Sequence, residues 1–152
     1  MTEADGPDQF AAMNENSTLP GKPLENLRIL VMEDEYLIAM DVEQMCQDHG
    51  AEKVVILRTL KELDDRTIVE HDISVAVVDV MLAGESTVEF AKTLVEGRIP
   101  FVFATGYAEN EHLFEAFPGI RIVGKPYSGP TLITAIVGAV EDRAGTEKSR
   151  GA

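Results

Sequence analysis

Residues 28–35, RILVMEDE, decide the fold of this chain, because a run of apolar residues stops there at three consecutive carboxylates. Four successive apolar side chains are typical of a strand that is covered on both faces of a sheet. Three adjacent acids repel one another, so one of them takes up a proton or a cation holds them all. The stretch therefore predicts a buried parallel strand that ends at a charged site.

Length and charge limit the class of protein. The chain has 152 residues, 45% of them apolar, which is enough for one domain with a core of its own. Its formal charge is −14, of which the first 24 residues carry −3, the last nine +1 and the part between them −12. A body this acidic repels phosphate backbones, so we do not expect DNA or RNA as a direct partner.

Cellular context follows from what the sequence lacks. The one cysteine, Cys46, excludes an intramolecular disulfide and a cysteine-rich metal site. No segment is apolar for long enough to span a membrane, and the acidic N-terminus MTEADGPDQF is unlike a signal peptide. We expect a cytoplasmic protein that does not enter a membrane.

The composition at both ends of the chain predicts disordered tails. Residues 1–24 mix Gly, Pro, Asn, Ser and acids without apolar periodicity, and we predict a disordered acidic tail there. We predict a second disordered tail over residues 144–152 and a single folded domain over residues 25–143. The residues after Val140 are too few to fold as a DNA-binding or catalytic output domain.

Between the tails, short apolar runs alternate with longer helical patterns. The predicted strands are residues 28–32, 53–57, 73–78, 100–104 and 120–123. Helices are indicated from residue 35 to residue 49, at the capping-box patterns Thr59-x-x-Glu62 and Ser86-x-x-Glu89, and at Ser128 before Pro130. This order predicts an α/β domain of the flavodoxin-like kind, in which a doubly wound five-stranded parallel sheet has helices on both faces. Residues 106–119 leave room for about two helical turns, so we expect the fourth helix to be short, displaced or absent.

Polar side chains follow four of the predicted strands. Glu33, Asp34 and Glu35 come after the first, Asp79 after the third, Thr105 after the fourth and Lys125 after the fifth. The carboxyl ends of parallel strands meet at one edge of the sheet, where ligands bind in such folds. Clustered carboxylates suit Mg²⁺, and an aspartate is able to form an aspartyl phosphate. A phosphoryl group on Asp79, with Mg²⁺, the Lys125 ammonium and the Thr105 hydroxyl around its oxygens, is the chemistry that these residues favour.

The motifs ILVMEDE, VAVVDVMLAGE, FVFATGY and VGKPY together resemble the receiver domain of two-component response regulators, over residues 25–143. The resemblance implies that Glu33 and Asp34 hold Mg²⁺ with Asp79 and the backbone carbonyl of Met81. It implies that Asp79 is the phosphoacceptor, that Thr105 is the switch hydroxyl, and that the bond from Lys125 to Pro126 is cis.

The segment from Phe103 to Tyr107 is also similar to the FAT GUY subfamily of single-domain receivers, whose donors are bacterial histidine kinases, often of the HWE type. The resemblance implies a histidine kinase and a downstream protein or phosphotransfer partner, and a role as effector, phosphate sink or relay. It implies no catalysis beyond the protein's own phosphorylation and dephosphorylation. Dimerisation through the last helix is compatible with this pattern.

The chain also departs from the family's pattern. Glu33 stands where the first aspartate of the acidic pair is usual, and its longer side chain implies contact through water. Residues 83–87, AGEST, replace the usual Pro-x-x-Asp-Gly, and Ile122 stands where a switching aromatic is common, a part that Tyr107 is placed to take.

Other interpretations stay open for the single residues and for the whole chain. Asp34 alone is equally a helix cap, and Lys125 alone a surface lysine. A degenerate receiver that binds a partner without phosphorylation is the main alternative. A phosphohydrolase lacks its Asp-x-Asp pattern, since Met81 takes the second position, and a flavodoxin-like cofactor binder lacks a Gly-rich loop after the first strand.

Overall fold

The computed structural model describes residues 21–64, 66–106, 115–126 and 128–151, with side chains up to residue 143. Five strands form one parallel sheet, which confirms the predicted fold class. Their order across the sheet is β2 (Lys53–Leu57), β1 (Arg28–Met32), β3 (Val75–Asp79), β6 (Phe101–Thr105) and β7 (Arg121–Gly124). All neighbouring strands run in the same direction, so the carboxyl ends of β1, β3, β6 and β7 lie side by side.

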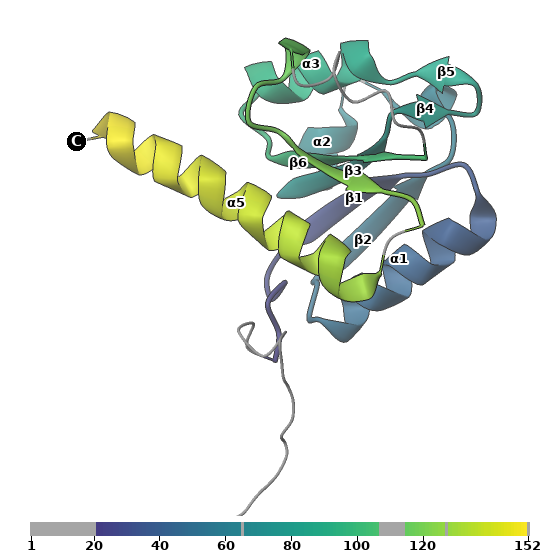
Figure 1. Cartoon of the computed structure of the whole chain (residues 1–152), viewed down its shortest axis with the longest axis horizontal. Coiled ribbons are helices and arrows are strands. Elements are labelled where there is room, and N and C mark those ends of the chain that lie inside the picture. The colour runs from purple at the N-terminus through teal and green to yellow at the C-terminus, as the bar shows by residue number, and fades with distance from the viewer. Residues whose placement is uncertain (1–20, 65, 107–114, 127, 152) are drawn as a thin grey trace, which may run out of the picture.

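Helices cover both faces of the sheet (Figure 1). The first face carries α1 (Tyr36–Asp48) and α5 (Gly129–Gly151), and the second carries α2 (Thr67–Glu70) and α3 (Val88–Glu96). Alternation along β1 divides the core between them, because Ile29 and Val31 pack in the cluster under α1 and α5. Leu30 and Met32 pack in the cluster under α3. A strand buried on both faces explains why its sequence is apolar without alternation.

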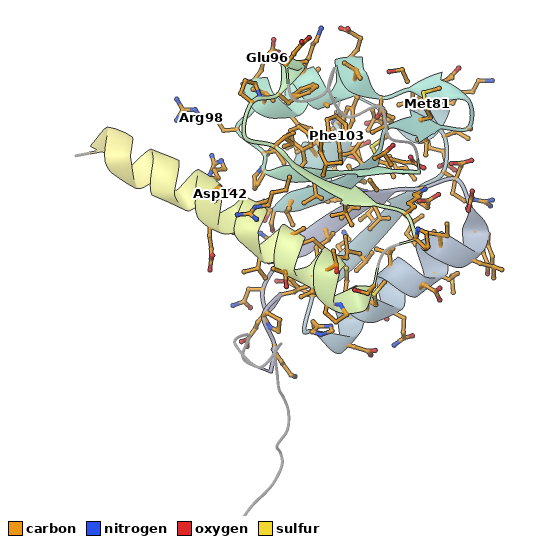
Figure 2. All side chains as sticks on the ribbon, in the orientation of Figure 1. Met81, Glu96, Arg98, Phe103 and Asp142 are labelled. Carbon is orange, nitrogen blue, oxygen red and sulfur yellow. The ribbon has the colours of Figure 1, made fainter. Side chains whose placement is uncertain are left out.

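Three phenylalanines pack together in the core of the second face. Phe103 lies inside the molecule between the sheet and α3 (Figure 2). Its ring centroid is 5.2 Å from that of Phe101 and 5.2 Å from that of Phe117, and both pairs meet edge to face. This geometry is the favourable one for aromatic pairs. It fixes β6 against the residues that lead into β7.

The helix predicted from Thr59 is broken into two short pieces. A 3-10 turn, η2 (Leu60–Glu62), carries the predicted capping box of Thr59 and Glu62, and the four-residue α2 follows. Between them the Asp64 carboxylate accepts the backbone N–H of Arg66 at 2.8 Å. Such local bonds compete with helical hydrogen bonds, which explains the interruption.

The segment after β3 forms a small hairpin before α3 begins. Strands β4 (Met81–Leu82) and β5 (Glu85–Ser86) pair in antiparallel fashion across Ala83 and Gly84. Both turn residues have positive φ, 51° and 84°, as a type I′ turn requires. Ser86 is therefore in a strand, and α3 takes Thr87 as its N-cap instead of the predicted Ser86.

The folded part of the chain extends into both predicted tails. Leu24 is fully buried in the first core cluster, and its N–H donates to the His49 carbonyl at 2.9 Å. At the other end α5 continues to Gly151, where we predicted disorder from residue 144. Extending an existing helix adds one hydrogen bond for each residue fixed and needs no new nucleus, so polar residues suffice there.

The predictions for the fourth helix and for most of the N-terminal tail stay predictions. Residues 107–114 of the expected fourth helix lie outside the described residues, as do residues 1–20 of the N-terminal tail. Within the described residues, no helix combines the length and the apolar character that crossing a bilayer requires.

The burial of Leu24 gives a stability prediction. We expect Leu24→Ala to lower the free energy of unfolding by about 2–5 kcal/mol, since it leaves a cavity in the core. Leu37→Ala is the matched control, because 76% of that leucine is exposed and its loss should change stability by less than about 0.5 kcal/mol. Urea unfolding measures both, and equal midpoints would contradict the placement of Leu24.

Candidate functional site

The sheet brings side chains from the ends of its strands to one edge. Glu33 follows β1, Asp79 ends β3, Thr105 ends β6, and Lys125 follows β7. All three of the residues Glu33, Asp79 and Thr105 are at most 6% exposed. Parallel register places them together, since Asp79 is opposite Ala104 and Thr105 is opposite Gly124.

Lys125 lies between two buried carboxylates. Its Nζ is 2.7 Å from Glu33 Oε1 and 2.8 Å from Asp79 Oδ2, and its side chain is only 14% exposed. Its backbone N–H donates to the Thr105 carbonyl at 2.8 Å. Charge-assisted bonds of this length are strong, and they position one ammonium between acids from two different strands.

Burial shapes the ionisation of this cluster. It raises the pKa of both Glu33 and Asp79, although their hydrogen bonds to Lys125 act in the opposite direction. For Lys125, burial lowers the pKa, but the bonds to Asp79 and Glu33 outweigh it and the pKa is raised. The ammonium therefore stays charged, and the two carboxylates hold protons more tightly than they do in water.

A third carboxylate completes a group that fits a divalent cation. One oxygen each of Glu33, Asp34 and Asp79 lies within 4.8 Å of the other two. With Lys125 counted, these four side chains carry a net charge of −2, which a divalent ion balances. Hard oxygen ligands in this number suit Mg²⁺, which binds to one or two carboxylates and keeps several waters.

The cluster opens onto a pocket of about 690 Å³. Asp79, Thr105 and Lys125 line it from the sheet, and Met81 and Gly84 line it from the hairpin. Glu33 is 2% exposed and is not among the lining residues, but it contacts Lys125, which is. The pocket is thus large enough for a phosphoryl group and waters, with Asp79 in its lining.

The structure places the remaining predicted residues as follows. The Met81 N–H donates to Asp79 Oδ1 at 3.4 Å. The bond from Lys125 to Pro126 is cis, as the resemblance implied. Ile122 is partly buried against the second core cluster. Tyr107 lies outside the described residues.

Sequence reasoning missed two residues that hold the site's backbone. Thr87 is fully buried, and its hydroxyl donates to the carbonyl of Asp79 at 2.7 Å and that of Val80 at 3.1 Å. Arg58 was not among the predicted site residues, yet its guanidinium donates to the Asp34 carbonyl at 3.1 Å. The signal for Arg58 was its place at the end of β2, beside β1, whereas nothing local marks Thr87.

No protein-family model matches the sequence, and no curated protein matches it closely enough to count as a relative. Solved structures are similar to it. The response regulator PhyR from Brucella abortus has a TM-score of 0.70 and 28% identity, and covers 88% of this chain and 56% of its own. The anti-anti-sigma factor PhyR from Bartonella quintana has a TM-score of 0.68 and 28% identity, with 82% and 51% covered. This chain therefore spans about half the length of these PhyR proteins.

A response regulator receiver protein from Sinorhizobium medicae matches over nearly its whole length. Its TM-score is 0.66 at 24% identity, and the match covers 79% of this chain and 98% of that one. At this identity the likeness concerns the fold. The five-stranded sheet with helices on both faces is the receiver fold, and its structural neighbours are response regulator receivers.

Metal binding at the acidic cluster gives a prediction with a definite sign in pH. Mg²⁺ at tenfold its dissociation constant should stabilise the protein by about 1.4 kcal/mol, seen as a rise in melting temperature of a few degrees. Because their pKa values are raised, Glu33 and Asp79 gain protons as pH falls, so the metal-free protein gains stability while Mg²⁺ loses its ligands. The rise in melting temperature should therefore shrink as the pH is lowered, beginning above the pH range in which ordinary carboxyl groups bind protons.

Two variants control this measurement. Asp34→Asn should abolish the effect of Mg²⁺, and Asp41→Asn, which removes one exposed charge from α1, should keep it. An equal effect of Mg²⁺ on both variants would show that the ion acts on the overall charge and not at this site.

Proposed function

We propose that the protein is a cytoplasmic response regulator receiver, which accepts a phosphoryl group on Asp79 from a histidine kinase in a Mg²⁺-dependent reaction. The observation that carries this proposal is the Lys125 ammonium held between Glu33 and Asp79, with Asp34 beside them and an open pocket in front. The receiver fold of the structural neighbours supports it.

The reaction asks little of the protein beyond position and charge. A carboxylate oxygen of Asp79 attacks the phosphorus of the kinase's phosphohistidine. The new O–P bond forms as the N–P bond breaks, and the imidazole nitrogen leaves with the electron pair and takes up a proton. Lys125 Nζ lies 2.8 Å from Asp79 Oδ2, where it can stabilise the negative charge of the phosphoryl oxygens.

Glu33, Asp34 and Asp79 would hold Mg²⁺, together with the backbone carbonyl of Met81. When bound, the ion offsets the negative charge of the phosphoryl oxygens. Glu33 already bonds to Lys125 through Oε1 and to the Glu35 N–H through Oε2, at 3.1 Å. We therefore assign it contact with the ion through water and assign Asp34 direct contact.

Phosphorylation changes the surface that a partner protein contacts. Thr105 lines the pocket beside Asp79, and its hydroxyl is the switch group that moves toward the phosphoryl oxygens. Tyr107 takes the part of the usual aromatic, since Ile122 has no ring. The output is a protein contact, or passage of the phosphoryl group along a sink or relay. The protein catalyses only its own phosphorylation and dephosphorylation.

The chemistry is tested with a small phosphodonor such as acetyl phosphate and Mg²⁺. We expect the mass of one phosphoryl group to be added to the wild type and none to Asp79→Asn, because Asp79 is the carboxylate that both lines the pocket and contacts Lys125. Asp34→Asn should slow labelling by at least about tenfold. Labelling of Asp79→Asn would refute the site, and no labelling of the wild type would favour a degenerate receiver.

An exposed apolar patch next to the acidic loop suits the phosphodonor. Tyr36, Leu37 and Met40 are 57%, 76% and 43% exposed, and they lie on α1, which begins directly after Glu35. The Arg58 guanidinium lies 5.6 Å from the centroid of the Tyr36 ring. A donor must reach the pocket with its phosphohistidine, so it covers the surface beside that pocket. We assign this patch to kinase docking.

The patch predicts a split between two kinds of donor. Leu37→Ala should slow transfer from a phosphorylated histidine kinase by about tenfold, since truncating a central interface residue costs about 1–2 kcal/mol. Its labelling by acetyl phosphate should stay unchanged. Val69→Ala, at a residue 79% exposed on α2, is the matched control. Equal slowing with both donors would place the effect in the site and not in docking.

A further inference from the structure

A second pocket lies at the opposite edge of the sheet from the acidic site. It has a volume of about 410 Å³ and is bounded by the end of α3, the first residues of β6 and β7, and α5. Its apolar lining includes Leu94, Ile99, Phe101 and Ile120. Figure 2 shows Arg98, which lines this pocket, and Met81, which lines the acidic one, on opposite sides of the molecule.

The charge of this pocket is opposite to that of the protein. Among the described residues, its lining holds three arginines, Arg98, Arg121 and Arg143, and two acids, Glu96 and Asp142. The lining therefore carries +1 in a chain of −14 that has only 13 basic residues. Such an excess attracts anions locally against the field of the whole molecule.

Arg98 is placed there against the local preference of the backbone. Helix α3 ends in a Schellman motif, in which Ile99 N–H donates to the Leu94 carbonyl at 2.9 Å and Arg98 N–H to the Val95 carbonyl at 3.1 Å. The left-handed position of this motif is usually glycine, but here Arg98 occupies it with φ of 60°. Gly97, one residue earlier, has an ordinary φ of −85°. A glycine is thus absent where it would relax the turn, and an arginine stands in its place.

Arg121 is accommodated by a second departure from preference. Gly138 is in the interior of α5, where glycine weakens a helix. A Cβ on Gly138 would lie 2.4 Å from Cζ of Arg121, so the guanidinium rests directly on the helix backbone. In this position Arg121 Nε is 3.2 Å from Asp142 Oδ2, an exposed pair that contributes little to stability. The positive φ of Arg98 and the glycine within α5 each lower local stability. Both departures place an arginine in the lining of the same pocket.

We propose that this pocket binds an organic anion, in which a carboxylate or phosphate head is held by Arg98 and Arg121 and an apolar body fills the space beside Phe101 and Leu94. The volume is in the range of small-molecule sites, and the combination of apolar walls with a few convergent charged groups is typical of them. Guanidinium groups match the planar, bidentate geometry of such heads. This site is separate from the acidic one, and the proposal does not depend on phosphorylation.

The test uses 2-naphthoate, titrated into the full chain and followed by NMR shifts of backbone amides. We expect shifts at Leu94–Phe101 and at the start of β7. The isosteric neutral 2-naphthamide should bind at least about tenfold more weakly, since it lacks the charge-assisted bonds. Acetate, which has the charge without the apolar body, should give no saturable shifts. Equal binding of naphthoate and naphthamide, or naphthoate shifts centred on Asp79, would overturn the proposal.

Two variants separate binding from folding. Arg98→Gly removes the head-group contact and relaxes the positive φ, so it should raise the melting temperature slightly while lowering naphthoate affinity by about tenfold. Gly138→Ala keeps every charge but displaces the Arg121 guanidinium, so it should weaken binding in a helix that is intrinsically more stable. Lys92→Ala, which removes an exposed charge from α3 outside the pocket, should bind as the wild type does. Wild-type affinity in both Arg98→Gly and Gly138→Ala would overturn the assignment.

Discussion

The structure depends on one buried ammonium that joins three strands. Lys125 follows β7, yet its Nζ reaches Glu33 after β1 and Asp79 at the end of β3, at 2.7 and 2.8 Å. Without it, two buried carboxylates of like charge would face each other, and removing one partner of a buried pair commonly costs about 3–5 kcal/mol. The sheet order β2-β1-β3-β6-β7 makes this contact possible. It places β3 next to β1, and only β6 lies between β3 and β7.

Packing around the acidic edge holds it in place in addition to its bonds with Lys125. Burial raises the pKa of Glu33 and Asp79, which means that their charged forms are disfavoured there. The buried residues on both sides of β3 fix the strand. The Thr87 hydroxyl bonds to the carbonyls of Asp79 and Val80 and so fixes the backbone at the end of β3, from which the Asp79 side chain extends. A divalent cation is expected to stabilise such a site, because it offsets the negative charge of carboxylates that water no longer solvates.

The two ends of the sheet carry opposite charge. Strands β6 and β7 begin at the arginine-lined pocket, at Phe101 and Arg121, and end at the acidic pocket, at Thr105 and near Lys125. Phe103 lies between the two ends and packs edge to face against Phe101 and Phe117. The same two strands therefore contribute residues to both pockets, Phe101 and Arg121 to one and Thr105 to the other, with Lys125 following β7. The aromatic cluster packs tightly between the two ends.

The sequence by itself determined the elements and the edge at which the chemistry gathers. Uninterrupted apolar runs predicted the buried strands, and the polar residues after them predicted Glu33, Asp34, Asp79, Thr105 and Lys125 at one edge, because parallel strands share a direction. It failed where local bonds override a pattern, as at Asp64 within the predicted second helix, and where burial comes from distant residues, as for Leu24. Only the tertiary structure decided that Arg58 and Thr87 support the site, that Lys125 bonds to two acids at once, and that Arg98 and Arg121 line one pocket. These contacts join residues far apart in the chain, and the distance between them is set by strand order and packing, which no local pattern contains.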